Sequence, residues 1–189
     1  ADYTRPLTLP EFVGVPIRKK AVYFPASAIG NLTAQAALEI LRQARRMVGA
    51  GGALLIVVDL KNDKLALAAA YNDAAGVTAA LNLNLLARIN RELGGDFQLP
   101  RFRHRAFYDE DRGWIEMHLE SLASQLVHVG GTRFRFNQGE TILTEISCKY
   151  SIEEFQAAAL GAGFAPGQTW IDAAKLFSVH GMIAVQPRS

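Results

Sequence analysis

Residues 53–58 read ALLIVV, an uninterrupted apolar run that ends at Asp59. Because every position is apolar, rather than every second one, the run predicts a central parallel strand that is buried on both faces. Upstream, KAVYFP at 20–25 predicts a short strand, and TAQAALEILRQARRMV at 33–48 has helical spacing up to Gly49. Strand, helix and strand in this order form a βαβ unit, so we expect an α/β fold.

The periodicity changes further along the chain. Leucine and isoleucine recur every four residues over 81–93, which predicts a helix, and from about residue 102 the period becomes two. Gly130-Gly131 between LVHV and TRFRF predicts a hairpin. SIEE at 151–154 is a capping box that opens another helix, and FSVHGMIAV at 177–185 predicts a last strand.

Two regions follow from this pattern. We expect residues 1–95 and 151–189 to form the latter part of a Rossmann-like sheet, and residues 96–150 to form an antiparallel β insertion. Two parallel-type strands are too few for a stable open sheet. Strands from the C-terminal segment, or from sequence that is absent here, are expected to complete it.

Composition excludes several classes of protein. The 189 residues carry a net charge of only +2, scattered along the chain, which argues against nucleic-acid or polybasic membrane binding. No apolar run approaches the ~20 residues that span a bilayer. The one cysteine, Cys148, cannot form an intramolecular disulfide, so a cytoplasmic location is expected. The four histidines lack ligand spacing, so no metal site is expected.

The loop after the first strand is the first candidate site. Ligands of open α/β sheets bind beyond the carboxyl ends of the strands, and PASAIGN at 25–31 places the amide of Asn31 there. The simpler interpretation, favoured on physical grounds alone, is that Asn31 or Thr33 caps the following helix.

The stretch AYNDAAGVTAALNLNLLARINREL at 70–93 is the second candidate. Its asparagines Asn82, Asn84 and Asn90 interrupt an apolar helical repeat, so they either line a polar cavity or satisfy loop backbone. Tyr71, just before them, is by itself more typical of a half-buried packing residue with a wet hydroxyl group.

Glu145 and Ser147 form the third candidate. Period-two geometry places both on one face of a strand, opposite Ile146 and Cys148. A carboxylate accepts hydrogen bonds and a hydroxyl donates or accepts, so together they match the two nitrogens of an imidazole. A solvated strand face is the simpler interpretation. Asp2-Tyr3 is a fourth candidate, an acid and an aromatic suited to an adenine, although two terminal residues alone establish nothing.

These segments together resemble one family. FPASAIGN, VDLKND, AYNDAAGVTAALNLNLLARINREL, WIEMHL, GETILTEISCKY and FSVH are similar to segments of histidine Nα-methyltransferases, the S-adenosylmethionine-dependent enzymes that make trimethylhistidine on the route to ergothioneine. The resemblance covers nearly the whole chain. It implies a class I methyltransferase sheet for the Rossmann-like part and a substrate-binding role for the β insertion.

The resemblance also implies roles for individual residues. Asn31 corresponds to the asparagine that holds the substrate's α-amine, and Tyr71 to the tyrosine that binds its carboxylate. Glu145 and Ser147 correspond to the pair that holds the imidazole. Three further assignments are Met117 in the substrate pocket, Asp2 and Tyr3 around the cofactor's adenine, and Ala26 beside its methionine end.

Two departures from the family pattern stand out. Ala26 occupies a position where glycine is usual, and its methyl group is expected to crowd the cofactor. The glycine-rich loop and the ribose-binding acid of the family are absent, so we expect a chain that lacks an N-terminal half and binds the cofactor poorly by itself. Two alternatives stay open: methylation of another amino acid, such as a tryptophan derivative, and a non-catalytic binding module.

Overall fold

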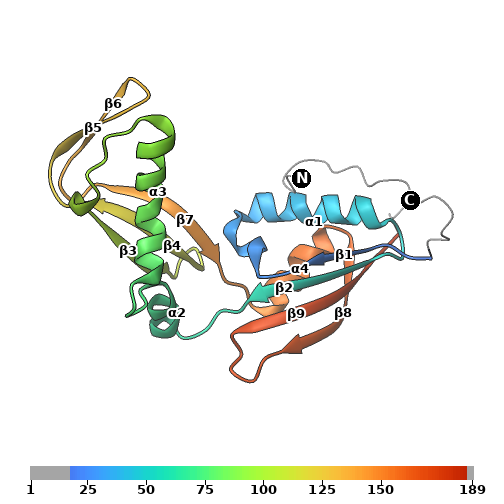
Figure 1. The fold of residues 1–189 in the computed structure, drawn as a ribbon. Helices are drawn as coiled ribbons and strands as arrows, with labels where there is room; N and C mark the ends of the chain where they lie inside the picture. The colour runs from blue at the N-terminus through green and yellow to red at the C-terminus, as the bar shows by residue number, and fades with distance from the viewer. Residues whose placement is uncertain (1–17, 187–189) are drawn as a thin grey trace. The chain divides into compact units, whose positions relative to one another are not determined.

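A computed structural model describes residues 18–186 (Figure 1). The chain divides into two compact units. The first ends at Asn62 and resumes at Cys148, and the second spans Asp63–Ser147. No helix among the described residues is both long enough and apolar enough to cross a membrane.

The first unit contains a four-stranded sheet with the order β1-β2-β9-β8 (Figure 1). Its strands are β1 (Ala21–Phe24), β2 (Ala53–Asp59), β8 (Phe164–Ile171) and β9 (Phe177–Ala184). β1 and β2 are parallel, whereas β9 is antiparallel to both β2 and β8. The expected βαβ unit is therefore confirmed, and the C-terminal strand extends the sheet next to it.

Two helices, α1 (Ala34–Val48) and α4 (Ile152–Gly161), pack against one face of this sheet. The Thr33 hydroxyl accepts a hydrogen bond from the Ala36 amide and caps α1, and Gly49 ends the helix. Ser151 and Glu154 form the expected capping box of α4. The core between helices and sheet is aliphatic and aromatic, and it includes Leu41, Leu54, Ile56, Val58, Phe155, Phe164 and Met182.

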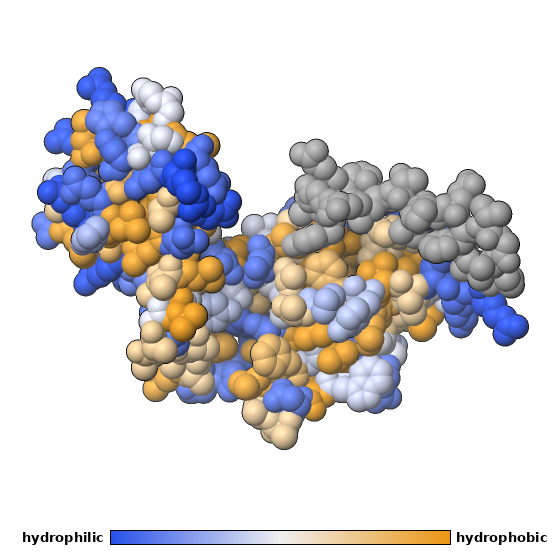
Figure 2. All heavy atoms as spheres, viewed as in Figure 1, coloured by the Kyte–Doolittle hydropathy of each residue, from blue (hydrophilic) through white to orange (hydrophobic). Residues whose placement is uncertain are grey.

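The opposite face of the sheet is not covered by the described residues. Tyr23, Leu55 and Ile183 are 65%, 38% and 47% exposed, and Trp170 is 51% exposed. Hydrophobic residues are visible at the surface of this unit in Figure 2. The expectation that β2 is buried on both faces therefore fails for this part of the chain, because α1 and α4 lie on the same side.

Strand β8 was not expected from the sequence. Its segment FAPGQTWI contains Pro166 and Gly167, which interrupt the alternation that identifies a strand, and the pairing with β9 shifts register between Pro166 and Thr169. Proline lacks the backbone donor that a central strand needs, so it is tolerated at an edge. Among the described residues β8 pairs only with β9.

The two chain segments that link the first unit to the second are tied to each other within the first unit. Leu60 and Tyr150 form a parallel β-bridge. Lys149, which is 4% exposed, places its ammonium 2.5 Å from the carboxylate of Asp59. The chain thus leaves the sheet after β2 and returns beside its own point of departure.

The second unit combines two helices with antiparallel strands (Figure 1). α2 (Lys64–Tyr71) and α3 (Val77–Leu93) pack on a sheet with the order β3-β4-β7. These strands are β3 (Phe102–Asp109), β4 (Trp114–Ser121) and β7 (Thr141–Cys148). β5 (Gln125–Val129) and β6 (Thr132–Phe136) form the expected hairpin, whose Gly130 and Gly131 have φ of 54° and 81°.

The boundary between the units differs from the expected one. Residues 63–95 were assigned to the Rossmann-like part, but they belong to the same compact unit as the antiparallel strands. The reason is packing: Leu67 of α2 contacts Ile115 and Met117, and Leu86 of α3 belongs to the cluster around Leu119.

The four-residue repeat of α3 identified the helix but not its buried face. Leu81, Leu85 and Leu93 are 64%, 40% and 59% exposed, whereas Asn82 and Leu86 are 2% exposed. A spacing of four residues drifts around a helix of 3.6 residues per turn, so the repeat does not mark a single inward face.

We predict that Asp73 makes the stability of the second unit depend on acid pH. Its carboxylate accepts hydrogen bonds from the amides of Thr78 and Val77, which lowers its pKa from 3.8 to about 2. A depressed pKa stabilises the fold above the unfolded-state value. This contribution is lost as the pH falls from about 4 to about 2.

Urea unfolding followed from about pH 5 to about pH 2 tests this prediction. Asp73→Ala should be less stable than the unmodified chain at the upper pH, and the two should converge at the lower one. Asp111→Ala removes an exposed aspartate of the same unit and is the control. Parallel curves for Asp73→Ala and the unmodified chain would contradict the prediction.

Candidate functional site

The loop after β1 lies at the carboxyl edge of the parallel strand pair. Ala26 and Ser27 have φ of 60° and 51°, in the left-handed region. The Ser27 hydroxyl accepts a hydrogen bond of 2.8 Å from the backbone N–H of Asp59, at the end of β2. Parallel strands end at the same edge, so the two loops are joined where α/β proteins bind their ligands.

Asn31 is the last residue of the short helix η1 (Ala28–Asn31), and it is exposed. Of the two candidates for capping α1, Thr33 has that role. The expectation that Asn31 or Thr33 caps the helix is therefore confirmed through Thr33, and Asn31 lies at the end of the loop that begins at Ala26.

Tyr71, Met117 and Ser147 come together in the second unit. Tyr71 packs against the cluster of Leu67, Ile115 and Met117. Its hydroxyl donates a hydrogen bond of 2.8 Å to the hydroxyl of Ser147, which is 5% exposed. Three residues from three separate segments thus lie close together, and they combine an apolar cluster with a hydrogen-bonded pair of hydroxyl groups.

Glu145 is half-buried on β7, two residues before Ser147. The other assigned residues lie elsewhere. Ala26 and Asn31 belong to the first unit, and Asp2 and Tyr3 are outside the described residues. The second unit therefore contains the residues assigned to the substrate's carboxylate and side chain, whereas the residue assigned to its amine belongs to the first unit.

The asparagines of α3 have different roles. Asn90 accepts a hydrogen bond from the backbone N–H of Phe97 and donates one to its carbonyl, both at 2.8 Å. It therefore satisfies loop backbone, which is the second of the two interpretations given for these asparagines. Asn82 is buried, and its amide nitrogen contacts the His118 carbonyl and the imidazole of His104.

Asn72 and His104 were not identified from the sequence, although both contact the segment around Tyr71. Asn72 donates to the Ala106 carbonyl at 2.9 Å, and His104 contacts the Tyr71 carbonyl at 2.8 Å. The sequence offers only a weak signal for them, since an Asn after a helix and an isolated His on a strand are common.

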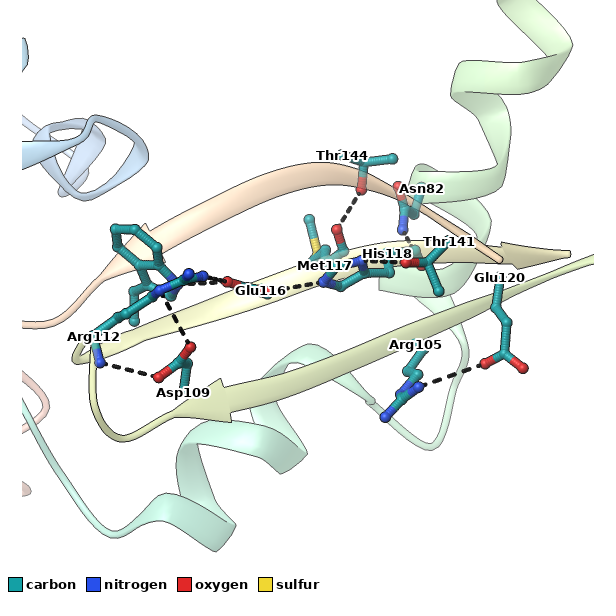
Figure 3. Close-up of polar contacts among 11 residues, drawn as sticks. Asn82, Arg105, Asp109, Arg112, Glu116, Met117, His118, Glu120, Thr141 and Thr144 are labelled. Atoms are coloured by element: carbon teal, nitrogen blue, oxygen red, sulfur yellow. Dashed lines mark hydrogen bonds and ion pairs between the residues drawn. The ribbon is translucent and has the colours of Figure 1, made fainter. Parts of the chain in front are cut away.

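A polar cluster occupies β4 at the positions next to Met117 (Figure 3). The carboxylate of Glu116 accepts hydrogen bonds from the indole of Trp114 at 2.9 Å and from Arg112 at 3.0 Å. These hydrogen bonds lower the pKa of Glu116, and the one from Trp114 has the largest effect. Burial acts in the opposite direction. His118 contacts the other carboxylate oxygen at 2.9 Å. These contacts explain how an acid is buried on a strand whose alternation predicted a polar face.

No group of three or more His, Cys, Asp or Glu residues that could hold a metal ion occurs among residues 18–186. An apolar groove of about 370 Å³ lies beside α3, with Leu85, Ile89, Leu93 and Ile142 in its lining. None of the assigned site residues within 18–186 lines it, so the groove and that part of the candidate site are separate features.

Comparison with known proteins decides the family. Residues 1–184 match the model of the histidine-specific, SAM-dependent methyltransferases. The chain belongs to this family. The histidine N-alpha-methyltransferase of Mycolicibacterium smegmatis is 40% identical over 165 residues, which are 86% of this chain and 51% of that protein. The protein of the same name from Mycobacterium tuberculosis is 37% identical over 163 residues, 85% of this chain and 51% of its own length.

This family member spans about half the length of the curated relatives it matches. Among solved structures, the CcbJ methyltransferase of Streptomyces caelestis aligns with a TM-score of 0.50 at 14% identity, covering 98% of this chain and 62% of that one. Identity this low supports only the fold, which is that of a class I methyltransferase, as expected from the sequence.

The left-handed conformation of Ala26 leads to a prediction about stability. An L-residue in this region costs roughly 1–2 kcal/mol, whereas glycine adopts it freely. Ala26→Gly should therefore raise the free energy of unfolding by about 1 kcal/mol in urea titrations. Ala157→Gly, in the exposed face of α4, should lower it by about 1 kcal/mol and serves as the control. A destabilised Ala26→Gly variant would contradict the strain.

The hydrogen bond between Tyr71 and Ser147 can be measured with a double-mutant cycle. Tyr71→Phe and Ser147→Ala each remove one hydroxyl, and the double variant removes both. A net hydrogen bond contributes about 1 kcal/mol, so we expect a coupling energy of about that size from urea unfolding. Additive effects of the two substitutions would show that the bond does not contribute to stability.

Proposed function

We propose that the protein containing this chain transfers methyl groups from S-adenosylmethionine to the α-amine of histidine, giving trimethylhistidine. The observation that carries the proposal is the Tyr71–Ser147 hydroxyl pair. It lies in the same unit as Glu145, and Tyr71 packs against the apolar cluster that contains Met117. In a member of a histidine-specific family, this arrangement supports a pocket for an amino acid with a polar aromatic ring.

The pocket has a chemical reason to prefer histidine. The Tyr71 hydroxyl has one proton, so it cannot donate to Ser147 and to a substrate carboxylate at once. When a carboxylate enters, donating to it is the stronger choice, because hydrogen bonds to ionised acceptors are worth roughly twice neutral ones. Ser147 then loses its Tyr71 partner and can bond an imidazole nitrogen, while Glu145 accepts from the ring's N–H.

The reaction requires an oriented amine. S-adenosylmethionine supplies a methyl group bound to a positively charged sulfur. We propose that the amide oxygen of Asn31 accepts a hydrogen bond from the neutral α-amine and so directs its lone pair, with Tyr71 and Glu145 holding the rest of the molecule. Orientation of this kind can contribute ~7–11 kcal/mol in favourable cases. Starting from the neutral amine, the first two transfers each lead to the loss of one proton. The third transfer releases none, because the trimethylated nitrogen keeps its positive charge and has no N–H.

The described residues fit the cofactor only at one end of its site. The loop at Ala26 lies at the carboxyl edge of β1, where it can contact the cofactor's methionine end, and Asp2 and Tyr3 are proposed to contact the adenine. We propose that a preceding part of a longer protein supplies the glycine-rich loop and the ribose-binding acid. The exposed face of the sheet and the length of the relatives support this part. A substrate domain built on the β insertion and a cytoplasmic location, favoured by the single buried thiol, complete the proposal.

Titration calorimetry of the full-length protein with histidine, with and without S-adenosylhomocysteine, tests the function. Histidine should bind, and more tightly with the cofactor product present. A folded protein that binds histidine in neither condition would favour one of the alternatives, another amino acid or a non-catalytic binding module. Tryptophan in the same titration separates these two.

Glu145→Ala tests the pocket. Hydrogen bonds to charged groups are worth about 1.5–3 kcal/mol, so histidine affinity should fall by roughly ten- to a hundredfold. Glu140→Ala removes an exposed glutamate in the turn just before β7, and it should leave the affinity unchanged. Unchanged histidine affinity and turnover in Glu145→Ala would remove the assignment.

A further inference from the structure

Asn82 is buried in a way that its place in the helix does not explain. It is 2% exposed on the sheet-facing side of α3, next to apolar neighbours such as Leu86. Its side-chain oxygen has no hydrogen-bond partner among the described residues. An unpaired buried polar atom costs about 1–3 kcal/mol, so packing alone would favour an apolar residue here.

The contacts of the Asn82 amide nitrogen fix its orientation. It lies 3.1 Å from the His118 carbonyl, which only accepts hydrogen bonds, so the nitrogen and not the oxygen must face β4 (Figure 3). Its second proton points to Nδ1 of His104, at 3.0 Å. Both protons of the amide are therefore used.

The same logic fixes the tautomer of His104. Nδ1 accepts from Asn82, so in the neutral ring the proton is on Nε2. Nε2 lies 2.8 Å from the backbone carbonyl of Tyr71, which again only accepts. The imidazole thus passes a hydrogen bond from α3 to the carboxyl end of α2.

This end of α2 needs external donors, because the last carbonyls of a helix have no partner within it. His104 donates to the Tyr71 carbonyl, and the side chain of Asn72 donates to the Ala68 carbonyl of α2 and also to the Ala106 carbonyl of β3. The backbone of Tyr71 is thereby held to β3, while its side-chain hydroxyl reaches Ser147 on β7.

We propose that Asn82 and His104 are positioning residues for the amino-acid pocket, which hold the backbone of Tyr71 so that its hydroxyl lies where it can donate to the substrate's carboxylate in place of Ser147. This proposal rests on the proposed function, because it assumes that Tyr71 binds substrate. A single path of hydrogen bonds leads from the His118 carbonyl through Asn82 and His104 to Tyr71 and Ser147. It joins β4, α3, β3, α2 and β7.

Variants of His104 separate positioning from packing. His104→Phe keeps a ring but neither bonds Asn82 nor donates to Tyr71. His104→Gln keeps one acceptor and one donor in one planar group. In the full-length protein, His104→Phe should weaken histidine binding and raise its KM roughly three- to tenfold, as the loss of one hydrogen bond implies, with a smaller effect on kcat. His104→Gln should restore most of the affinity.

Asn82 has a matched control in the same helix. Asn82→Leu removes both donors and should weaken histidine binding as His104→Phe does, and the two effects should not add, because both variants break one path. Asn90→Leu also removes an amide that bonds backbone, a half-buried one, but at Phe97, away from Tyr71. It should lower thermal stability without changing histidine affinity.

Measuring Tyr71→Phe in parallel distinguishes the two proposals. If Tyr71→Phe weakens histidine binding while folded His104→Phe and Asn82→Leu do not, the positioning role is overturned and the pocket stands. If Tyr71→Phe itself leaves binding unchanged, the proposed pocket fails and the positioning role fails with it. Equal losses of affinity in His104→Phe and His104→Gln would also overturn the proposal, because they would indicate packing rather than hydrogen bonding.

Discussion

The ion pair between the buried Lys149 and the half-buried Asp59 is the contact on which the arrangement of this chain depends. A unit that spans Asp63–Ser147 is inserted between β2 and α4, so the chain must leave the sheet and return to the same place. The ion pair and the bridge of Leu60 to Tyr150 hold the two segments together. A buried charge that loses its partner is strongly destabilising, so this closure favours one register for β2 and the segment that leads into α4.

The closure also determines what lies at the carboxyl edge of the parallel strands. The backbone N–H of Asp59 donates to Ser27, so the residue that pairs with Lys149 also anchors the loop after β1. Ala26 and Ser27 in that loop have left-handed backbone conformations, a local cost that such a site can retain when its geometry is needed for binding. Asp59 and Ser27 therefore both stabilise the first unit and shape the loop that is proposed to contact the cofactor.

In the second unit, buried polar side chains connect elements that apolar packing alone would leave free to slide. Leu67 and Leu86 pack α2 and α3 onto the sheet, but apolar contacts are not directional. The hydrogen bonds of Asn82 and His104 are directional, and they fix the position of the carboxyl end of α2 along β3. In the proposed amino-acid pocket, a fixed Tyr71 would offset the cost of a buried amide, because selectivity for one small amino acid depends on accurately placed polar groups.

The sequence by itself determined the βαβ start, the capping box at Ser151, the Gly130-Gly131 hairpin and the placement of Glu145 and Ser147 on one strand, since each follows from local periodicity or turn chemistry. It narrowed the cap of α1 to Asn31 or Thr33, and the structure decided for Thr33. Motif resemblance added the family. Only the tertiary structure decided that residues 63–95 join the β insertion, that β8 exists despite Pro166, and that Asn82 and His104 reach Tyr71. These features depend on contacts between residues far apart in the chain, which the local periodicity of the sequence cannot predict.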